Sequence, residues 1–347
     1  MYTIGMKKGM KKRSYKISAI LLAAVFLIAA LSACGASGGT GGGTTGGGQQ
    51  TSSGGGLLSG ILGKGGVKPT VVDPADAPVR DNAPKVLTCE TGDKTFSENG
   101  ATVDYSNIDS GYIMAKYAGE NPKIKLQITH TGDQNTYTYD LTPNADFEPF
   151  PVQNSGEYTI AVFTNISGDQ YSQACAGQVN VQLTDPFQPF LHPNQYCWFT
   201  DSTQAVAKGA ELAKGAKSDL KVIENIFIWM TGNIKYDYAL SKNVQSGYVP
   251  DVDRTLTTKE GICFDYASLM TCMLRTQNIP CKLVVGYAGA EYHAWISVYV
   301  NGQGWVYNMI QFNNDTWTLM DPTFAANGDT SDPNKSDGTT YNPIYYY

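Results

Sequence analysis

The sequence predicts an α+β protein in which a small all-β sandwich precedes a domain built from a helix packed on an antiparallel sheet. Apolar and polar residues alternate from residue 85 to about residue 183, which is typical of short strands with one buried face. After Cys263, apolar residues instead recur at every third or fourth position, as on an amphipathic helix. Three strand patterns follow this helix, at residues 291–300, 304–307 and 317–320.

Residues 1–33 have the pattern of a secretory leader. Six basic residues precede an apolar run from Ala19 to Leu31, which is too short for a comfortable membrane span. The run ends in Leu-Ser-Ala-Cys, which resembles a bacterial lipobox. This pattern predicts cleavage before Cys34 and a diacylglycerol anchor on its thiol, which would hold the mature protein outside the cytoplasm on the cell membrane or in the envelope. The alternative is an ordinary signal peptide followed by a chance cysteine.

Residues 34–84 are predicted to form a flexible tether. Gly, Ser and Thr dominate from Gly35 to Gly66, and such a segment cannot bury enough apolar surface to offset the entropy lost on ordering. Four prolines keep the remainder extended. We therefore expect no folded structure before about Lys85.

Residues 85–185 are predicted to form the sandwich, which we expect to be immunoglobulin-like. Alternating runs are separated by turns rich in Gly, Asn and Asp; the runs lie at residues 123–129, 137–141, 158–162 and 179–183. This segment carries no combination of catalytic side chains. We interpret it as a spacer that positions the following domain, with binding of a substrate or of the cell wall as the alternative.

A second domain is predicted over residues 186–330, followed by a tail at residues 331–347. A proline-rich stretch from Asp185 to Pro193 marks the boundary, and helical patterns follow it. Ser218 is a plausible N-cap for the second of these helices. A polar connection over residues 239–258 precedes Cys263, and we interpret it as a cleft wall or lid.

Cys263 is predicted to lie in the first turn of the next helix. Polar or small residues precede it, and the apolar periodicity begins at Ile262. In a first turn, unpaired amides and the positive end of the helix dipole favour an anion, which lowers the pKa of a thiol. The same amides could hold a developing oxyanion.

His293 and Asp321 are the candidate partners of this cysteine. The chain contains three histidines, and His130 and His192 lie in the sandwich segment and the proline-rich connector. His293 instead lies in a strand pattern 30 residues after the cysteine, and Asp321 follows the third strand pattern. A helix packed on an antiparallel sheet could bring a nucleophile, a base and an orienting carboxylate together.

Four segments resemble the transglutaminase-like superfamily, a branch of the papain-like cysteine enzymes: GICFDYASLMTCMLRTQNIPCKLVVGY, YHAWISVYV, GWVYN and LMDPTF. The resemblance covers about residues 200–325 and implies a papain-like transglutaminase core. It also implies that Cys263 of the G-x-C motif is the nucleophile, His293 of the H-A-W motif its base, and Asp321 of the D-P-T motif the residue that orients the histidine. Tyr236 stands where the family often carries an aromatic hydrogen-bond donor near the oxyanion.

The resemblance implies acyl transfer at amide bonds of a protein or peptide substrate through a thioester. Water as the second nucleophile would give a peptidase or deamidase, and a lysine amine would give a cross-link. Bacterial members are often taken to be peptidases, which favours hydrolysis by a small margin. The alternative is an inactive binding or structural lipoprotein, in which the cysteine is a buried hydrophobe, the histidine a half-buried polar group and the Asp-Pro pair a turn.

The seven cysteines leave several pairings open. Setting aside Cys34 and the candidate nucleophile leaves five, so at least one thiol stays free. Cys89 could pair with Cys175 across the sandwich, and Cys272 with Cys281 across a helix-to-strand turn.

Charge and spacing exclude some partners. Without the six basic residues of the leader, the chain has 19 basic and 31 acidic residues, which gives a net charge of about −12. This negative charge argues against a nucleic-acid partner. No spacing is typical of a zinc or calcium site, so we expect no cofactor.

Overall fold

The structure is a computed structural model that describes residues 14–16, 71–73, 75–306, 309–313, 316–319, 321–327 and 341–347. The apolar run of the predicted leader, Cys34 and most of the predicted tether lie outside the described residues. Within the described part of the chain, no helix is long and apolar enough to cross a membrane.

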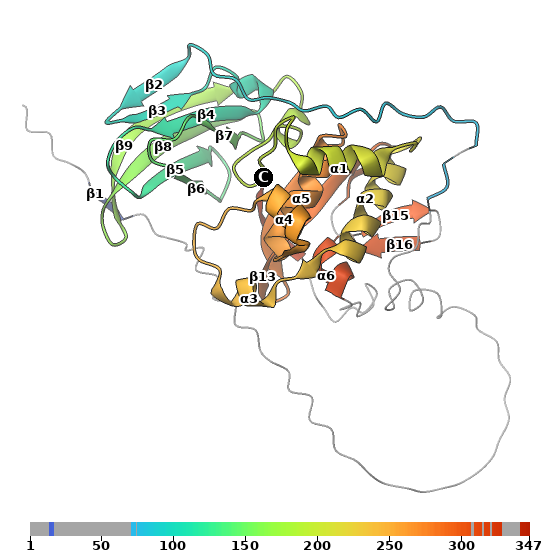
Figure 1. Cartoon of the computed structure of the whole chain (residues 1–347). Helices are drawn as coiled ribbons and strands as arrows, with labels where there is room; N and C mark the ends of the chain where they lie inside the picture. Colours follow the sequence, from blue (N-terminus) through green and yellow to red (C-terminus); the bar gives the residue numbers. More distant parts are fainter. Residues whose placement is uncertain are drawn as a thin grey trace, which may run out of the picture.

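The first domain consists of two antiparallel sheets, with strand orders β1-β9-β8-β5-β6 and β2-β3-β4-β7 (Figure 1). The first sheet contains β1 (Ser14–Lys16), β5 (Ile124–His130), β6 (Tyr137–Leu141), β8 (Gly156–Ser167) and β9 (Gln170–Val181). The second contains β2 (Thr95–Glu98), β3 (Ala101–Asp104), β4 (Tyr112–Tyr117) and β7 (Glu148–Pro151), with the short helix η1 (Ile108–Ser110) before β4. Alternate residues of both sheets, such as Val103, Leu126, Phe150 and Ile160, are buried in a common core because each sheet turns one apolar face inward.

The second domain is built around helix α5 (Cys263–Arg275), of which every residue except Phe264 is buried. The elements before it are η2 (Gln188–Phe190), α1 (Gln204–Ala213), α2 (Asp219–Asn233), β10 (Lys235–Tyr236), α3 (Tyr238–Asn243), α4 (Val252–Thr258) and β11 (Glu260–Gly261). Ser218 caps α2, since its hydroxyl accepts from the Lys221 amide at 3.2 Å. Helices α1, α2 and α4 contact one side of α5, and strands β12 and β13 contact it as well, so the central helix is enclosed.

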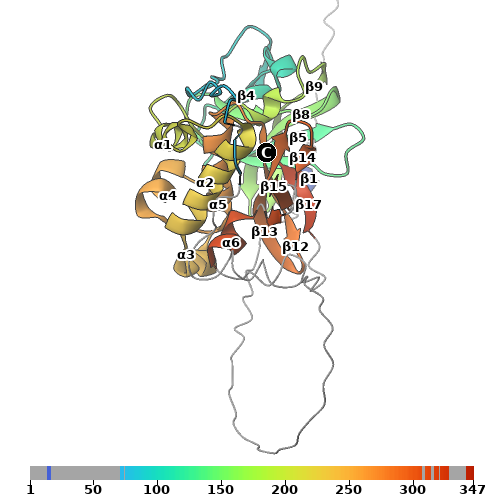
Figure 2. The ribbon, with the colours of Figure 1, turned by 90° about the vertical axis from the view of Figure 1, so that its right-hand side faces the viewer.

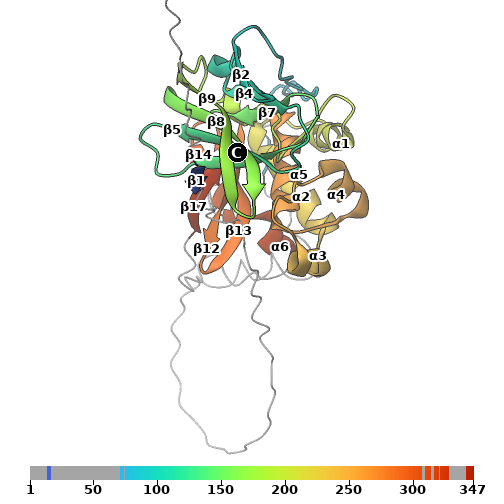
Figure 3. The same ribbon diagram turned by 90° about the vertical axis from the view of Figure 1, so that its left-hand side faces the viewer.

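An antiparallel sheet with the order β14-β13-β12-β17 follows α5. Its strands are β12 (Cys281–Ala288), β13 (Glu291–Val300), β14 (Gly304–Val306) and β17 (Tyr341–Tyr346); a separate hairpin of β15 (Met309–Asn313) and β16 (Thr316–Leu319) leads to α6 (Pro322–Asn327). Figure 2 shows the helices gathered on one side of this domain and strands β12, β13 and β17 on the other. Figure 3, from the opposite direction, shows sandwich strands β8 and β9 in front of the second domain.

The last seven residues are part of this sheet, whereas the sequence predicted a separate tail at residues 331–347. Strand β17 pairs antiparallel with β12, and Tyr347 exchanges two backbone hydrogen bonds with Leu283. The ring of Tyr347 packs against Tyr137 and Tyr139 of the sandwich, with ring centroids 5.7 and 5.9 Å apart. The aromatic ending therefore joins the two domains, because it supplies a strand to one and a buried ring to the other.

Residues 71–85 also pack against the second domain, whereas the sequence predicted a free tether up to residue 84. The Val71 amide donates to the buried Glu224 of α2 at 2.9 Å, and Arg80 forms an ion pair with Asp219 at 3.0 Å. The Lys85 amide donates to the carbonyl of Thr276, just after α5. Figure 1 shows this blue segment, which we call the strap, running past the helices towards the sandwich.

The two disulfides that the sequence left open do not form, because all six described cysteines are free thiols. Cys89 lies before the first sandwich strand rather than within the sheet, and its thiol faces His192 Nδ1 at 3.7 Å. The thiol of Cys281 lies 3.5 Å from the hydroxyl of Thr271 on α5.

Candidate active site

Cys263 is the first residue of α5. Strand β11 delivers the chain to the N-cap Ile262, whose backbone is extended (φ −90°, ψ 176°), and the Tyr266 amide then makes the first intrahelical bond to the Ile262 carbonyl. The amides of a first turn have no partner within their own helix. The Cys263 amide is therefore available, by helix geometry, to a negatively charged group beside the thiol.

His293 and Asp321 form a buried pair. His293 Nε2 lies 2.5 Å from Asp321 Oδ2, and the two side chains are 6% and 1% exposed. Strand β13 carries the histidine, and the aspartate immediately precedes α6. The Thr323 amide donates to the other carboxylate oxygen at 3.0 Å, and the Tyr341 hydroxyl donates to Oδ2 at 3.1 Å. Both oxygens of the carboxylate are thus fixed, which in turn fixes the imidazole ring.

Cys263 is the other partner of this imidazole. Burial disfavours the charged ring, but the charges of Asp321 and Cys263 and hydrogen bonds to both outweigh burial and raise the pKa of His293 to about 10. The histidine therefore carries a proton at neutral pH. The arrangement is a cysteine sulfur, an imidazolium and a carboxylate in sequence, and these are the groups that nucleophilic catalysis by cysteine uses.

Tyr236 lies close to Cys263. Strand β10 pairs in parallel with β11, so that Tyr236 is opposite Gly261, and the Asp237 amide donates to the Gly261 carbonyl at 2.9 Å. Burial is the largest cause of a raised pKa at Tyr236, and the charge of Cys263 raises it further. Its hydroxyl therefore stays neutral and able to donate a hydrogen bond.

The structure thus brings together four of the residues singled out in the sequence, namely Cys263, His293, Asp321 and Tyr236. The fifth, Cys34, lies outside the described residues. Among the described residues, no three or more His, Cys, Asp or Glu side chains lie together in a way that could hold a metal ion.

In a second cysteine–histidine contact, the pKa of the histidine is lowered instead of raised. His192 lies between Cys89 and Gln188, with its Nε2 3.1 Å from the Gln188 amide oxygen. Burial and then the charge of Arg275 lower the pKa of His192 to about 4, while burial raises the pKa of Cys89 to about 12. Both groups are neutral at pH 7, because no carboxylate supports this imidazole, so the pair lacks the charge separation found at His293.

Sequence reasoning missed three contributions to the site. Tyr341 contacts Asp321 from the C-terminal strand, and no motif marks that strand. Trp295, to which no role was given, packs nearly parallel to His293 at 6.1 Å and edge-on to Tyr341 at 5.0 Å. Asp265, buried in the first turn of α5, binds the Ile262 amide at 2.9 Å. An acidic residue three positions after an N-cap is a known helix-start signal, so only this last residue had a sequence pattern that could have revealed it.

Comparison with known proteins finds a family that matches part of the second domain. Residues 206–309 match the family described as the transglutaminase-like superfamily. This part of the chain is a transglutaminase-like domain. The matched segment runs from α1 to β15 and contains Cys263 and His293; Asp321 follows it in the chain.

Individual relatives of the transglutaminase-like domain are distant. The UPF0252 protein MJ1282 of Methanocaldococcus jannaschii is 26% identical over 248 residues, which cover 62% of this chain and 67% of that protein. Kyphoscoliosis peptidase of Mus musculus is 30% identical over 131 residues, which cover 34% of this chain and 17% of the peptidase. Among solved structures, red sea bream transglutaminase is 14% identical with a TM-score of 0.25, covering 66% of this chain and 49% of that one.

Proposed function

We propose that the protein is a cysteine enzyme of transglutaminase-like type that acts on amide bonds of a protein or peptide through Cys263, His293 and Asp321. One observation carries the proposal: a buried imidazole lies between a carboxylate at 2.5 Å and a cysteine at the start of a helix. A helix start offers unpaired amides to an oxyanion, and the carboxylate stabilises the imidazolium beside the cysteine sulfur.

In the first half-reaction, the sulfur of Cys263 attacks the amide carbonyl carbon. The carbonyl oxygen becomes an oxyanion, which accepts hydrogen bonds from the Cys263 amide and the Tyr236 hydroxyl. His293 passes its proton to the departing amine, so the C–N bond breaks and a thioester remains. In the second half-reaction, His293 takes a proton from the incoming nucleophile, which attacks the thioester carbonyl; the C–S bond breaks, and Cys263 leaves as a thiolate beside the protonated histidine.

The incoming nucleophile decides the class of reaction. Water gives hydrolysis, whereas a lysine amine gives a cross-link, and both reactions use the same three residues. We favour hydrolysis by a small margin, and the name of one relative, a peptidase, supports this choice. The proposed substrate is a protein or peptide at the cell surface.

The leader supports a proposal about location. We infer that the chain is cut before Cys34 and held by a lipid on that thiol, outside the cytoplasm on the cell membrane. The support is the basic stretch, the short apolar run and the lipobox-like ending, all of which are features of the sequence. Replacement of Cys34 by Ser is expected to move the protein from the membrane fraction to the soluble fraction of fractionated cells.

The reaction itself is tested by incubating the protein with a glutamine-rich protein and a fluorescent primary amine. Dye incorporation and new chain ends are followed together for the protein, for Cys263→Ala and for Cys175→Ala, which removes a buried thiol from the sandwich as a matched control. New chain ends that require Cys263 mean a peptidase, and dye incorporation without cleavage means a transglutaminase. If Cys263→Ala leaves both signals unchanged, the proposal is wrong and a binding or structural role is favoured.

A further inference from the structure

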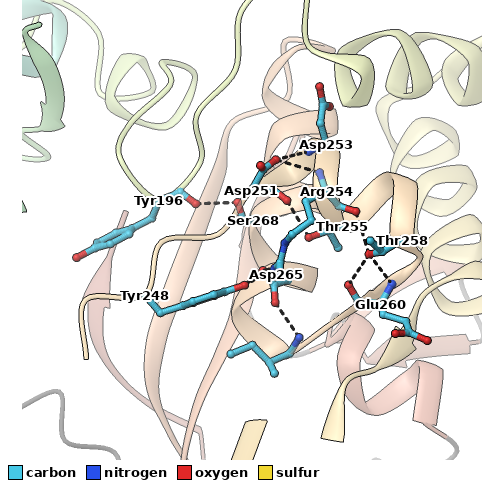
Figure 4. A network of polar contacts seen from close by, with 11 residues as sticks. Tyr196, Tyr248, Asp251, Asp253, Arg254, Thr255, Thr258, Glu260, Asp265 and Ser268 are labelled. Carbon is cyan, nitrogen blue, oxygen red and sulfur yellow. Dashed lines mark hydrogen bonds and ion pairs between the residues drawn. The ribbon is translucent and has the colours of Figure 1, made fainter. Parts of the chain in front are cut away.

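The first turn of α5 is capped in an unusual way. An N-cap side chain normally accepts a hydrogen bond from an amide of the first turn, but the N-cap here is Ile262, which has no acceptor. Asp265 reaches back instead, and its Oδ2 accepts from the Ile262 amide at 2.9 Å. The Gly261–Ile262 peptide, one residue before Cys263, is therefore held by one carboxylate (Figure 4).

The other oxygen of Asp265 is held from outside the helix. Oδ1 accepts from the Tyr248 hydroxyl at 2.6 Å and from Arg254 Nη2 at 2.8 Å, and Arg254 also contacts the Tyr248 hydroxyl. Arg254 lies in the first turn of α4, where its own amide donates to the N-cap Asp251 at 3.0 Å. Figure 4 shows the guanidinium and the phenol approaching the carboxylate from the polar segment before α5.

A helix start can be capped without the buried carboxylate and the two further side chains found here. An Asn or Ser at the N-cap would satisfy an amide without a buried charge. Asp265 is fully buried, and removing one partner of a buried ion pair usually destabilises a protein more than the intact pair stabilises it. Such a network is costly as a source of stability, but it fixes a unique arrangement of the groups around it.

The network also fixes the strand that carries the second oxyanion donor. A Cβ on Gly261 would lie 2.6 Å from the Cβ of Asp265, so β11 passes directly over the carboxylate. Because β10 pairs with β11, this close approach also sets the position of Tyr236. One side chain thus holds the Gly261–Ile262 peptide before Cys263 and the strand pair that carries Tyr236.

We propose that Asp265, clamped by Arg254 and Tyr248, is a positioning residue that sets the geometry of Cys263 and its oxyanion donors. The inference rests on the proposed function above and adds three residues that act through Cys263 rather than on substrate. Small displacements of a nucleophile lower the rate of the chemical step, so the clamp should act on kcat more than on KM.

The test compares Asp265→Asn with Arg254→Gln, because the two variants separate position from charge. Asp265→Asn removes a negative charge near Cys263 and leaves the arginine, so charge alone predicts faster alkylation of Cys263 by iodoacetamide at neutral pH. Arg254→Gln leaves the carboxylate unpaired, so charge alone predicts slower alkylation. A positioning role predicts slower alkylation in both variants, by about tenfold or more, with a matching fall in kcat and little change in KM.

Tyr248→Phe is the milder third variant, and it keeps the test decisive if either charge variant fails to fold, because it removes only one hydroxyl. Loss of one hydrogen bond to a charged group predicts a rate about 3- to 10-fold lower. Tyr112→Phe, which removes a hydroxyl that accepts from the Glu90 amide at 3.0 Å, is the control outside the site and should leave the rate unchanged. Rates that move in opposite directions in the two charge variants, or that do not move in any of the three, overturn the inference. If His293→Gln also leaves alkylation unchanged, the proposed function itself fails.

Discussion

The imidazole of His293 has its charge set by two neighbours that come from different parts of the chain. Asp321 follows strand β16, 28 residues after the histidine, and Cys263 starts helix α5, 30 residues before the histidine. Their combined effect raises the pKa of His293 to about 10 against the opposing effect of burial. The following two predictions concern these three side chains.

Asp321→Asn should leave the protein folded but reduce its activity on the order of 10³-fold. The amide cannot stabilise an imidazolium, and it can present an N–H to the ring and so favour the wrong tautomer. Activity and circular dichroism are measured on the same preparation. A loss of activity that tracks a loss of helical signal would instead assign the residue a structural role.

The stability of the protein should depend on pH through His293. Its pKa is raised from 6.5 to about 10 on folding, so the folded protein binds this proton more tightly than the unfolded chain does. This contribution is fully present below pH 6.5 and is lost as the pH rises towards 10. The free energy of unfolding is measured with urea at about pH 6, pH 8 and pH 10 for the protein and for His293→Gln. The difference between them should shrink with rising pH, and a constant difference would contradict the raised pKa.

At the scale of elements, β17 completes the sheet, and Tyr347, which follows it, provides one of three acceptors for a buried charge. Arg275, at the end of α5, is 1% exposed and donates to three backbone carbonyls, those of Cys281, His192 and Tyr347. The carbonyl groups come from β12, the connector and the last residue of the chain. Hydrogen bonds to these carbonyls offset the free-energy cost of burying the guanidinium charge, so removing one carbonyl leaves part of that cost without an offset.

Deletion of residues 341–347 should therefore destabilise the protein by about 3 kcal/mol or more. The deletion removes a strand from β12, an acceptor from Arg275 and the Tyr341 hydroxyl from Asp321. Urea unfolding of the truncated chain measures the loss. Arg275→Met in the truncated chain is the control: it should recover part of the stability, because it removes the uncompensated charge. No recovery would mean that the lost strand accounts for the whole effect.

The helix that begins at Cys263 could be predicted from its three-and-four apolar period, and the strand that carries His293 from its run of aromatic and β-branched residues. The roles assigned to those residues stay a prediction. Strand β17 could not be predicted, since Tyr-Asn-Pro-Ile-Tyr-Tyr shows no clean alternation and takes its structure from β12. Tyr248 and Arg254 lie in a polar segment whose only visible signal was its composition, so their convergence on Asp265 depends on tertiary packing alone.

At the scale of the whole molecule, the strap makes the two domains one continuous unit. It contacts the start of α2 through Arg80 and the end of α5 through Lys85 before the chain enters the sandwich. A sequence rich in proline and without apolar periodicity is typical of a linker. The residues that the strap contacts are more than 130 positions away in the sequence, so no local pattern indicates these contacts. This distance is why the sequence predicted a tether there.

A chain that begins at residue 86 should therefore be less stable than one that begins at residue 70, by about 1 to 3 kcal/mol. The shorter chain lacks the buried Val71, whose amide binds Glu224, and the guanidinium that pairs with Asp219. Thermal or urea unfolding of the two chains gives the difference. The matched single variant Arg80→Ala in the longer chain should show part of the loss, and equal stability of all three chains would mean that the strap contributes nothing.

The route of the strap also determines how mechanical tension would enter the protein. Tension applied to the chain immediately before Val71 reaches α2 first, through the Val71–Glu224 and Arg80–Asp219 contacts, and reaches the strands that follow the strap only after these contacts have separated. The strap would then peel from α2 one contact at a time, while the paired strands of the sandwich remain unloaded. Under pulling, the helix layer that encloses α5 would feel the load before the sandwich does, although the sandwich comes first in the sequence.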